Sequence, residues 1–321
     1  MERSTEKLLK AREKNVPQGP FNIHPIFARE ASGEIITSID GKEYIDFTTG
    51  IGTVNVGHCP KMVVDAISDQ VTKYLHTCFH VVMYEPYIEL AEKLNALTPG
   101  DFPKKTMLVN SGAEAVENGI KIARCFTGRP GIICFEQGFH GRTLLAMSLT
   151  SKVKPYKFGF GPFPPEIYRM PYPYCYRCRF GLTYPDCELR CAEYLQEFFI
   201  NNAAAEHIAA IIIEPVTGEG GFIVPPNGYF PKLNEICKEH GIVLIMDEVQ
   251  SGIGRTGTLF AIEHFGIEPD VLLTAKSLAA GLPLAGVIGR AEIMDAPMSA
   301  GWVAHMAEIR SLAVRPWPCS R

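Results

Sequence analysis

The stretch that decides the fold runs from Tyr229 to Glu248, "YFPKLNEICKEHGIVLIMDE". Its first half has the apolar spacing of a helix and stops at Gly241, a residue typical of a helix C-terminus. The apolar run that follows, 242–246, predicts a strand buried on both faces of a sheet. Two carboxylates, Asp247 and Glu248, come directly after that strand. A helix, a glycine stop and a buried strand in this order predict one unit of an α/β sheet.

The same unit recurs along the chain. Together with 241–248, we expect buried strands at 106–109, 131–135, 208–214 and 271–274. Helical patterns lie between them, as where Val116, Ile120 and Ala123 follow the spacing i, i+4, i+7. This alternation predicts a doubly wound α/β domain with a mostly parallel sheet and helices on both faces.

The first sixty residues have a different pattern. The segment 33–52, "GEIITSIDGKEYIDFTTGIG", resembles a hairpin with a turn at Asp40-Gly41, followed by a strand. We therefore expect residues 1–60 to form the N-terminal part of a separate small domain. Residues 61–297 are expected to form the large domain, with a cysteine-rich insertion at 173–191. The last segment, 298–321, shows no strong periodicity.

Composition excludes some classes of protein. The net charge is −4, from 31 Lys and Arg against 35 Asp and Glu, so nothing indicates a surface for nucleic acid or membrane. No apolar run approaches the roughly 20 residues of a membrane span. The N-terminus is charged and has no signal-peptide core, so we expect a cytoplasmic protein.

Ten cysteines are many for such a protein. Six are scattered and are expected to be reduced: Cys59, Cys78, Cys125, Cys134, Cys237 and Cys319. Four lie in "YCYRCRFGLTYPDCELRC", namely Cys175, Cys178, Cys187 and Cys191. Their spacing resembles a zinc or iron–sulfur ligand set. The second pair is not CxxC and no histidine lies between the pairs, which favours a surface insertion with reduced thiols.

Polar or aromatic side chains follow each predicted strand, at the edge where an open α/β sheet binds its ligands. They are Ser111, Phe139, His140, Arg142, Glu214, Asp247, Gln250 and Lys276. Ser111 and Glu114 fit a capping box, so a helix begins there, and its N-terminus suits an anion such as phosphate. Taken alone, a plain helix cap is the simpler interpretation.

Lys276 stands inside "LLTAKSLAAGLPLAGVIG" (272–289), which is otherwise almost wholly apolar. Desolvation lowers the pKa of such a lysine toward the neutral, nucleophilic amine. A phosphate site, an aromatic face, a buried acid and a buried lysine on one sheet edge suit pyridoxal phosphate. Its aldehyde needs a lysine for a Schiff base, and its ring nitrogen needs an acid.

Longer segments carry a family resemblance. "LIMDEVQSGIGRTG" (244–257), then Asp270 and "AKSLAAG" (275–281), resemble the signature of class III pyridoxal-phosphate aminotransferases. "NSGAEAVENGIKIAR" (110–124) and "IIIEPVTGEGGF" (211–222) resemble the bacterial 4-aminobutyrate aminotransferase branch. The resemblance covers about residues 10–297 and implies a fold-type I pyridoxal-phosphate transferase.

The resemblance implies roles in holding the cofactor. Lys276 forms the Schiff base and shuttles the proton, Asp247 pairs with the pyridinium nitrogen, and Gln250 contacts the ring's 3-oxygen. The phosphate contacts fall on Ser111, Gly112 and Ala113, and the ring contacts on Phe139, which stacks, and His140 beside it.

It also implies roles toward the substrate. Ile51 and Arg142 face the substrate, and Arg142 grips the distal carboxylate of 4-aminobutyrate. Glu214 lies near the substrate, and Glu219 is a gate residue that changes partners when an α-carboxylate arrives. The amino group passes to 2-oxoglutarate, and the active site is expected at the interface of a homodimer. Ornithine, 5-aminovalerate and lysine stay open as donors.

Two other functions stay open from the sequence. An amino-acid racemase could use the same scaffold and would not require 2-oxoglutarate. A non-catalytic metal-binding or interaction protein could use the cysteine cluster. The second does not explain why Lys276, Asp247, Gln250 and the phosphate site occur together.

The resemblance stops after Pro297, where the family continues into a C-terminal small domain. Reading the codons of Gly301 to Cys319 two bases out of frame permits "GGTYGGNP", which resembles the family's next motif. We hypothesise an insertion or deletion near codon 298, and expect transaminase activity to be impaired in this chain.

Overall fold

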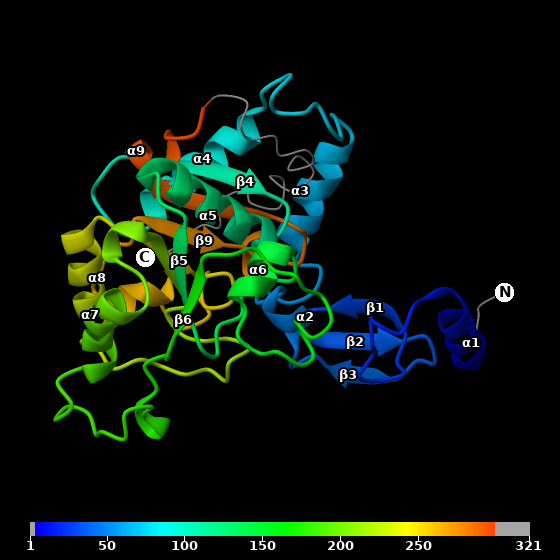
Figure 1. Ribbon diagram of the computed structural model, residues 1–321. Helices are drawn as coiled ribbons and strands as arrows, with labels where there is room; N and C mark the ends of the chain where they lie inside the picture. Colours follow the sequence, from blue (N-terminus) through cyan, green and yellow to red (C-terminus); the bar gives the residue numbers. More distant parts are fainter. Residues whose placement is uncertain (1–3, 299–321) are drawn as a thin grey trace.

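The computed structural model describes residues 4–298, and the described chain forms two sheets (Figure 1). The larger sheet has seven strands in the order β4-β10-β9-β8-β7-β5-β6, and the smaller has three in the order β1-β2-β3. Figure 1 shows the small sheet extending from one side of the larger body, with α1 (Thr5–Asn15) at its far end.

The large sheet is mostly parallel, as the sequence predicts. Its strands are β4 (Lys104–Val109), β5 (Gly131–Phe135), β6 (Ile167–Met170), β7 (Ile208–Ile213), β8 (Val243–Asp247), β9 (Val271–Thr274) and β10 (Ala285–Arg290). The pairs β6-β5, β5-β7, β7-β8 and β8-β9 are parallel. Only β10 runs against its neighbours, β4 and β9. Neither β6 nor β10 is among the strands expected from the sequence.

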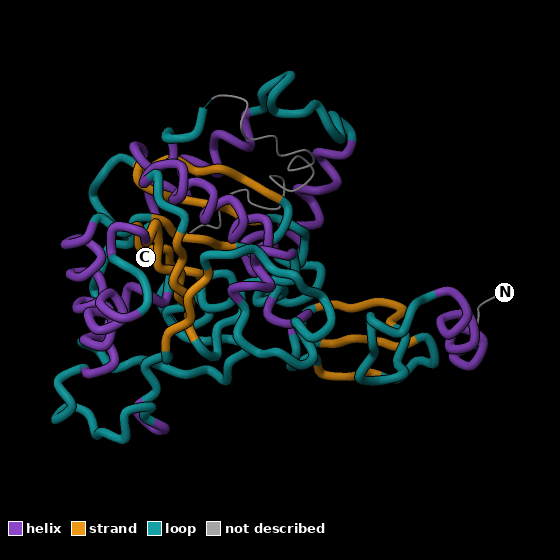
Figure 2. The backbone as a smooth tube through the Cα atoms, in the orientation of Figure 1, coloured by secondary structure: helices purple, strands orange, loops and turns teal. Residues whose placement is uncertain are grey.

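Helices cover both faces of this sheet (Figure 2). One face packs against α4 (Glu85–Leu97), α7 (Arg190–Asn201) and α8 (Tyr229–His240). The other packs against α5 (Gly112–Thr127), α6 (Leu144–Leu149) and α9 (Ala291–Met294). Side chains of β8 alternate between the two cores, with Leu244 on the first face and Ile245 on the second. This alternation explains why the strand is apolar throughout.

The segment from α8 to β8 confirms the unit predicted from the sequence. The aromatic side chains of Tyr229 and Phe230 are buried at the start of the helix. Gly241 ends it in the left-handed conformation, with φ of 60°, which costs little without a Cβ. The chain can therefore turn at once from helix into strand.

The small sheet confirms the predicted hairpin. Its strands are β1 (Ala28–Ser32), β2 (Ile35–Ser38) and β3 (Glu43–Ile45), all antiparallel, and Gly41 has φ of 78° in the turn. The strand expected after the hairpin was wrong. Residues there form a turn and the short α2 (Thr49–Gly52), because Asp46 Oδ1 accepts hydrogen bonds from the backbone N–H of Thr48 and Thr49. The longer α3 (Lys61–Val71) then leads into the large domain.

Four short 3₁₀ turns complete the described elements: η1 (Cys175–Arg177), η2 (Ala205–His207), η3 (Ala261–Phe265) and η4 (Lys276–Ala279). Among helices within residues 4–298, none is both long and apolar enough to cross a membrane. The boundaries 1–60 and 61–297 stay predictions. The tail 299–321, with the proposed reading-frame change, lies outside the described residues.

Candidate active site

Lys276 follows directly after β9 and the single residue Ala275. Its backbone φ is 43°, a strained value for a residue with a side chain, and such strain is common at functional sites. Its Nζ donates a hydrogen bond to Oε1 of Gln250. Burial lowers the pKa of the Lys276 ammonium, while the carboxylates of Asp247, Glu214 and Glu219 oppose that shift. The net effect favours the neutral amine.

Asp247 ends β8, and its side chain is buried. Its Oδ2 lies 2.7 Å from Nδ1 of His140, and its Oδ1 accepts from the backbone N–H of Val249 at 3.1 Å. An ionised carboxylate has no proton to give, so the imidazole Nδ1–H is the donor. The backbone N–H of His140 in turn donates to Thr150 Oγ1 at 3.0 Å. These contacts fix the direction in which the acid points.

Glu214 follows β7, and its carboxyl group is also buried. It accepts hydrogen bonds from the backbone N–H groups of Phe139 and Gly218, both at 2.8 Å. Burial raises the pKa of Glu214 to about 7, although the nearby His140 lowers it. Glu214 therefore ties the loop after β5 to the loop after β7, and holds Phe139 beside the cavity.

The helix α5 begins at the edge of the site, with Ser111 as its N-cap. Ser111 Oγ accepts from the backbone N–H of Glu114 at 3.2 Å, which confirms the predicted cap. In a full capping box, the Glu114 side chain would accept from the backbone N–H of Ser111. Here Glu114 Oε2 accepts instead from the backbone N–H of Asn110, one residue earlier. The N–H groups of Gly112 and Ala113 belong to the first turn, where a helix has no partners of its own for them.

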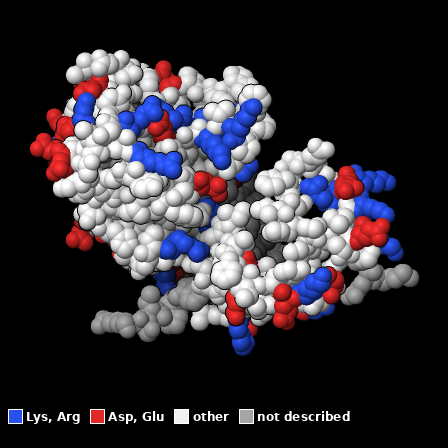
Figure 3. All heavy atoms as spheres, turned by 90° about the horizontal axis from the view of Figure 1, so that it is seen from below, with Lys and Arg blue, Asp and Glu red and all other residues white. Residues whose placement is uncertain are grey.

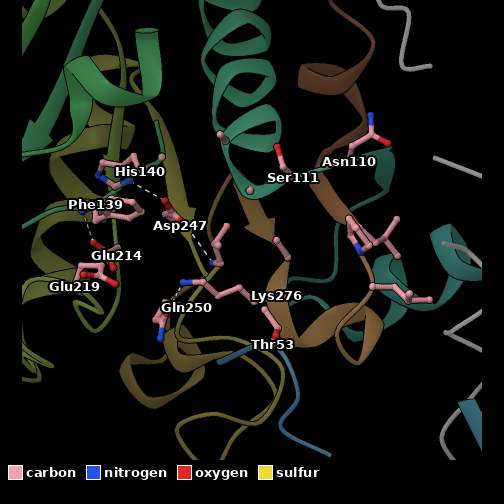
Figure 4. A pocket seen from close by; sticks show the side chains of 18 of the residues that line it. Thr53, Asn110, Ser111, Phe139, His140, Glu214, Glu219, Asp247, Gln250 and Lys276 are labelled. Carbon is pink, nitrogen blue, oxygen red and sulfur yellow. Dashed lines mark hydrogen bonds and ion pairs between the residues drawn. The ribbon is translucent and has the colours of Figure 1, made fainter. Parts of the chain in front are cut away.

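These groups surround one cavity of about 390 Å³. Figure 4 shows Lys276 reaching toward Gln250, with Asp247 and His140 on a neighbouring part of the wall. The sequence-predicted residues in this lining are Ser111, Gly112, Ala113, Phe139, His140, Glu214, Glu219, Asp247, Gln250 and Lys276. Segments from four strand ends and one helix N-terminus thus meet where sequence analysis expected them to meet.

Two predicted substrate residues lie outside that lining. Ile51 lines an adjoining cavity of about 460 Å³, together with Phe47, Glu219 and Arg255. Arg142 is exposed, and its guanidinium lies over the ring of Tyr156, 4.8 Å from the centroid. Glu219 lines both the main cavity around Lys276 and the adjoining cavity of Ile51, so it lies where the two cavities meet.

Several lining residues were missed by sequence reasoning. Two of them line the main cavity: Thr53, which directly follows α2, and the segment 281–284, which directly precedes β10. Tyr156 lines a third cavity of about 310 Å³ with Phe139 and Glu219. Its only signal was its place near a proline- and glycine-rich stretch. Such a composition is typical of a loop and does not by itself indicate a site.

The four clustered cysteines lie around one small cavity of about 20 Å³, apart from the active site. All four are free thiols, and burial raises the pKa of Cys191 to about 11. Within residues 4–298, no three His, Cys, Asp or Glu side chains are placed to hold a metal ion. A surface insertion with reduced thiols stays the prediction from the sequence, and a metal site stays its alternative.

The surface carries charges of both signs. On the face shown in Figure 3, Lys and Arg side chains lie interspersed with Asp and Glu over both the main body and the small lobe. Near the N-terminus, the exposed pairs Lys10–Glu6 and Arg29–Glu30 approach within 2.7 and 2.8 Å. Such exposed pairs contribute little to stability.

The residues around the main cavity fit pyridoxal phosphate. The first turn of α5 offers backbone N–H groups for a phosphate, and Phe139 offers an aromatic face. Asp247 is a buried acid held in place by His140, and Lys276 is a partly buried amine. An α/β sheet with this set on its carboxyl edge defines a pyridoxal-phosphate-dependent transferase.

The chain belongs to the class-III aminotransferase family, whose model matches residues 16–306. A "Probable 4-aminobutyrate aminotransferase" of Bacillus subtilis is 49% identical, over 91% of this chain and 67% of its own length. The "5-aminovalerate aminotransferase DavT" of Pseudomonas putida is also 49% identical, over 92% of this chain and 68% of its own length. The chain thus spans about two thirds of each relative.

Solved structures agree with this family. An (S)-enantioselective omega-transaminase from Thermomicrobium roseum superposes with a TM-score of 0.89 at 32% identity, covering 98% of this chain and 74% of the other. An amine transaminase from an uncultivated Pseudomonas species, in its PLP-bound form, gives a TM-score of 0.83 at 29% identity, covering 92% and 70%. The protein is a class III aminotransferase, with pyridoxal phosphate as its cofactor.

Proposed function

We propose that this protein moves the amino group of an ω-amino acid, 4-aminobutyrate or 5-aminovalerate, to 2-oxoglutarate. The observation that carries the proposal is the placement of Lys276 in one cavity with Asp247 and the N-terminus of α5. The choice of donor is supported by the names of the two relatives at 49% identity.

The cofactor would be held at both ends. The N–H groups of Gly112 and Ala113 would bind its phosphate, and Lys276 would bind its aldehyde. Asp247 would face the ring nitrogen, and Gln250 the oxygen on the ring. When bound, pyridoxal phosphate supplies an aldehyde that joins the amine and a protonated ring that withdraws electrons.

Proton transfer would then fall to Lys276. Its Nζ is neutral when desolvation prevails, so it can take the proton from the amine-bearing carbon of the donor. Gln250 Oε1, which accepts a hydrogen bond from Nζ, orients the lone pair of that nitrogen. The contact with the imidazole of His140 holds the Asp247 carboxyl group in place.

The far end of the substrate would meet Arg142. A planar guanidinium binds a carboxylate through two parallel hydrogen bonds, and an ω-amino acid carries its carboxylate away from the reacting carbon. Ile51 and Phe47 would contact the methylene groups, since both line the adjoining cavity. Glu214 and Glu219 lie near the path of the substrate, and Glu219 is our candidate for the gate residue.

We also propose that the protein forms a homodimer. Large apolar side chains are exposed on several segments, among them Ile23 at 78%, Val81 at 76% and Phe47 at 89%. Exposed apolar patches often mark protein interfaces. Light scattering should give a mass near twice that of the chain, and a monomer at all concentrations would contradict this proposal.

The first experiment is an absorbance spectrum of purified protein with added pyridoxal phosphate. The expected result is a visible band that borohydride bleaches, with the reduced cofactor then found attached to Lys276 by peptide mass spectrometry. Lys276→Ala should lose both the band and the attached cofactor. Lys157→Ala is the matched control, because burial also lowers the pKa of Lys157 and it lies outside the cavity lining.

The second experiment supplies donors to the loaded protein and measures glutamate formed from 2-oxoglutarate. We expect turnover with 4-aminobutyrate or 5-aminovalerate above that of Lys276→Ala, at the impaired rate expected from the sequence. Loss of optical activity in an α-amino acid without 2-oxoglutarate would instead indicate a racemase. Loaded protein that forms no glutamate from any of these donors would contradict the proposed function.

A further inference from the structure

Tyr156 lies between α6 and β6 and contacts three side chains of the proposed site. Its ring meets that of Phe139 edge-on, with centroids 5.2 Å apart. The guanidinium of Arg142 lies over the same ring, 4.8 Å from the centroid. Its hydroxyl donates a hydrogen bond to Oε2 of Glu219 at 3.0 Å. Burial and the Glu219 carboxylate both raise the pKa of the Tyr156 phenol, so it keeps the proton that it donates.

Arg142 is held by aromatic rings rather than by an acid. Besides Tyr156, it lies 5.9 Å from the ring centroid of Phe139. Within the part of the chain that the structure describes, Arg142 makes neither a hydrogen bond nor an ion pair. Attraction to a ring face requires no hydrogen bond to an acid, so the N–H donors of the guanidinium are not committed to a carboxylate of the protein. These donors are what a carboxylate would bind.

Glu219 is the acid nearest to this arrangement. It lines the cofactor cavity, the cavity of Ile51 and the cavity of Tyr156, so its side chain lies where the three meet. At the cavity of Tyr156, the Tyr156 hydroxyl donates a hydrogen bond to Oε2 of Glu219 and so holds this carboxylate oxygen in place. Arg142 and Glu219 thus both contact Tyr156, yet among the described residues they form no ion pair with one another.

We propose that Tyr156 is a positioning residue that keeps Glu219 away from Arg142 and so leaves Arg142 available for the carboxylate of the substrate. The proposal rests on the proposed function, in which Arg142 binds the distal carboxylate. Without the hydroxyl, Glu219 loses its hydrogen bond and pairs with Arg142, a stronger partner than water. The carboxylate of Glu219 then competes with that of the substrate.

The test is Tyr156→Phe, which removes the hydroxyl and keeps the ring under Arg142. Tyr168→Phe is the matched control, because Tyr168 donates a similar bond to Glu166 at 2.7 Å outside the site. Calorimetry measures the binding of pentanoate, a carboxylate without an amino group, with pentanamide as its neutral counterpart. We expect Tyr156→Phe to weaken pentanoate binding roughly tenfold. Tyr168→Phe should leave it unchanged.

Two further variants show whether the mechanism is the proposed one. Arg142→Gln should abolish the preference for pentanoate over pentanamide. Adding Glu219→Gln to Tyr156→Phe should restore most of the lost affinity, because a neutral amide cannot form an ion pair with the guanidinium. Equal affinity in wild type and Tyr156→Phe would overturn the proposal, as would a double variant that binds no better than Tyr156→Phe.

Measuring these affinities with and without pyridoxal phosphate separates this proposal from the proposed function. If Lys276 takes no cofactor, the proposed function fails, while the pentanoate affinities still decide the role of Tyr156. In loaded, active protein, Tyr156→Phe should raise KM for 5-aminovalerate about tenfold and leave KM for pentylamine unchanged. Equal effects on both donors would contradict a role toward the carboxylate.

Discussion

The proposed role of Asp247 in catalysis depends on the negative charge of its carboxylate more than on the shape of the side chain. Asp247→Asn keeps an oxygen for the N–H of Val249, but an amide nitrogen cannot accept from His140 Nδ1–H. We expect kcat to fall roughly 10²–10⁴-fold, the range for losing a group that sets protonation in the site. Steady-state kinetics with the best donor measures it, and Asp295→Asn is the control because Asp295 pairs with Lys105 at the surface. A kcat within twofold of wild type would contradict the proposed role.

The lysine and the two buried acids found from the sequence share one property, which is their place at or just after the end of a strand. Lys276, Asp247 and Glu214 each follow an apolar run, and parallel strands end at the same edge of a sheet. Tyr156 and Thr53 lack that property. They reach the site through loop paths and packing between segments far apart in the sequence, and one sequence carries no pattern for such placement.

At the level of elements, the stability of α5 depends on the N-cap hydrogen bond that Ser111 makes in its first turn. Ser111→Ala removes the acceptor for the N–H of Glu114 and should lower the free energy of unfolding by about 0.5–2 kcal/mol. Cofactor binding should persist, because the backbone donors of Gly112 and Ala113 remain. Urea unfolding followed by circular dichroism measures the first effect, and a cofactor titration the second. Ser111→Thr keeps the hydroxyl and serves as the control. Unchanged stability in Ser111→Ala would argue against the cap.

The elements also show where sequence patterns work and where they fail. The strands β5 and β9 begin and end where their apolar runs predicted, at 131–135 and 271–274. The strand β10, 285–290, was missed because Gly286 and Gly289 interrupt its apolar pattern. A Cβ on Gly289 would lie 3.1 Å from the backbone oxygen of Asp270, so close packing explains this glycine. Such a reason is visible only in the folded chain.

For the whole molecule, Glu248 links stability to pH. Burial raises the pKa of its carboxyl from 4.5 to about 7, and it accepts hydrogen bonds from Ser251 Oγ and the N–H of Ile262. Between these values the folded chain keeps a proton that the unfolded chain has lost. The stabilisation from this group is therefore complete below about pH 4.5, and is lost as the pH rises through about 7.

Glu248→Gln should remove this dependence because an amide stays neutral. Relative to wild type, the variant should gain about 1–3 kcal/mol of unfolding free energy between pH 4.5 and pH 8. Denaturant unfolding at both pH values measures the difference. Glu235→Gln on the exposed face of α8 is the control. Parallel pH profiles for wild type and Glu248→Gln would show that Glu248 is not the group responsible.

The antiparallel strand β10 has a consequence for the size of the ligand. It lies between β4 and β9, and its first residues pair with the last of each, as Ala285 does with Val109 and Gly286 with Thr274. The ends of β4 and β9, from which the chain continues to the N-terminus of α5 and to Lys276, are therefore two strand spacings apart, about 9–10 Å. A ligand that uses both must carry its anionic group and its carbonyl at matching positions. The order of the strands in the sheet, together with the reach of the Lys276 side chain, thus sets the spacing that such a ligand must match.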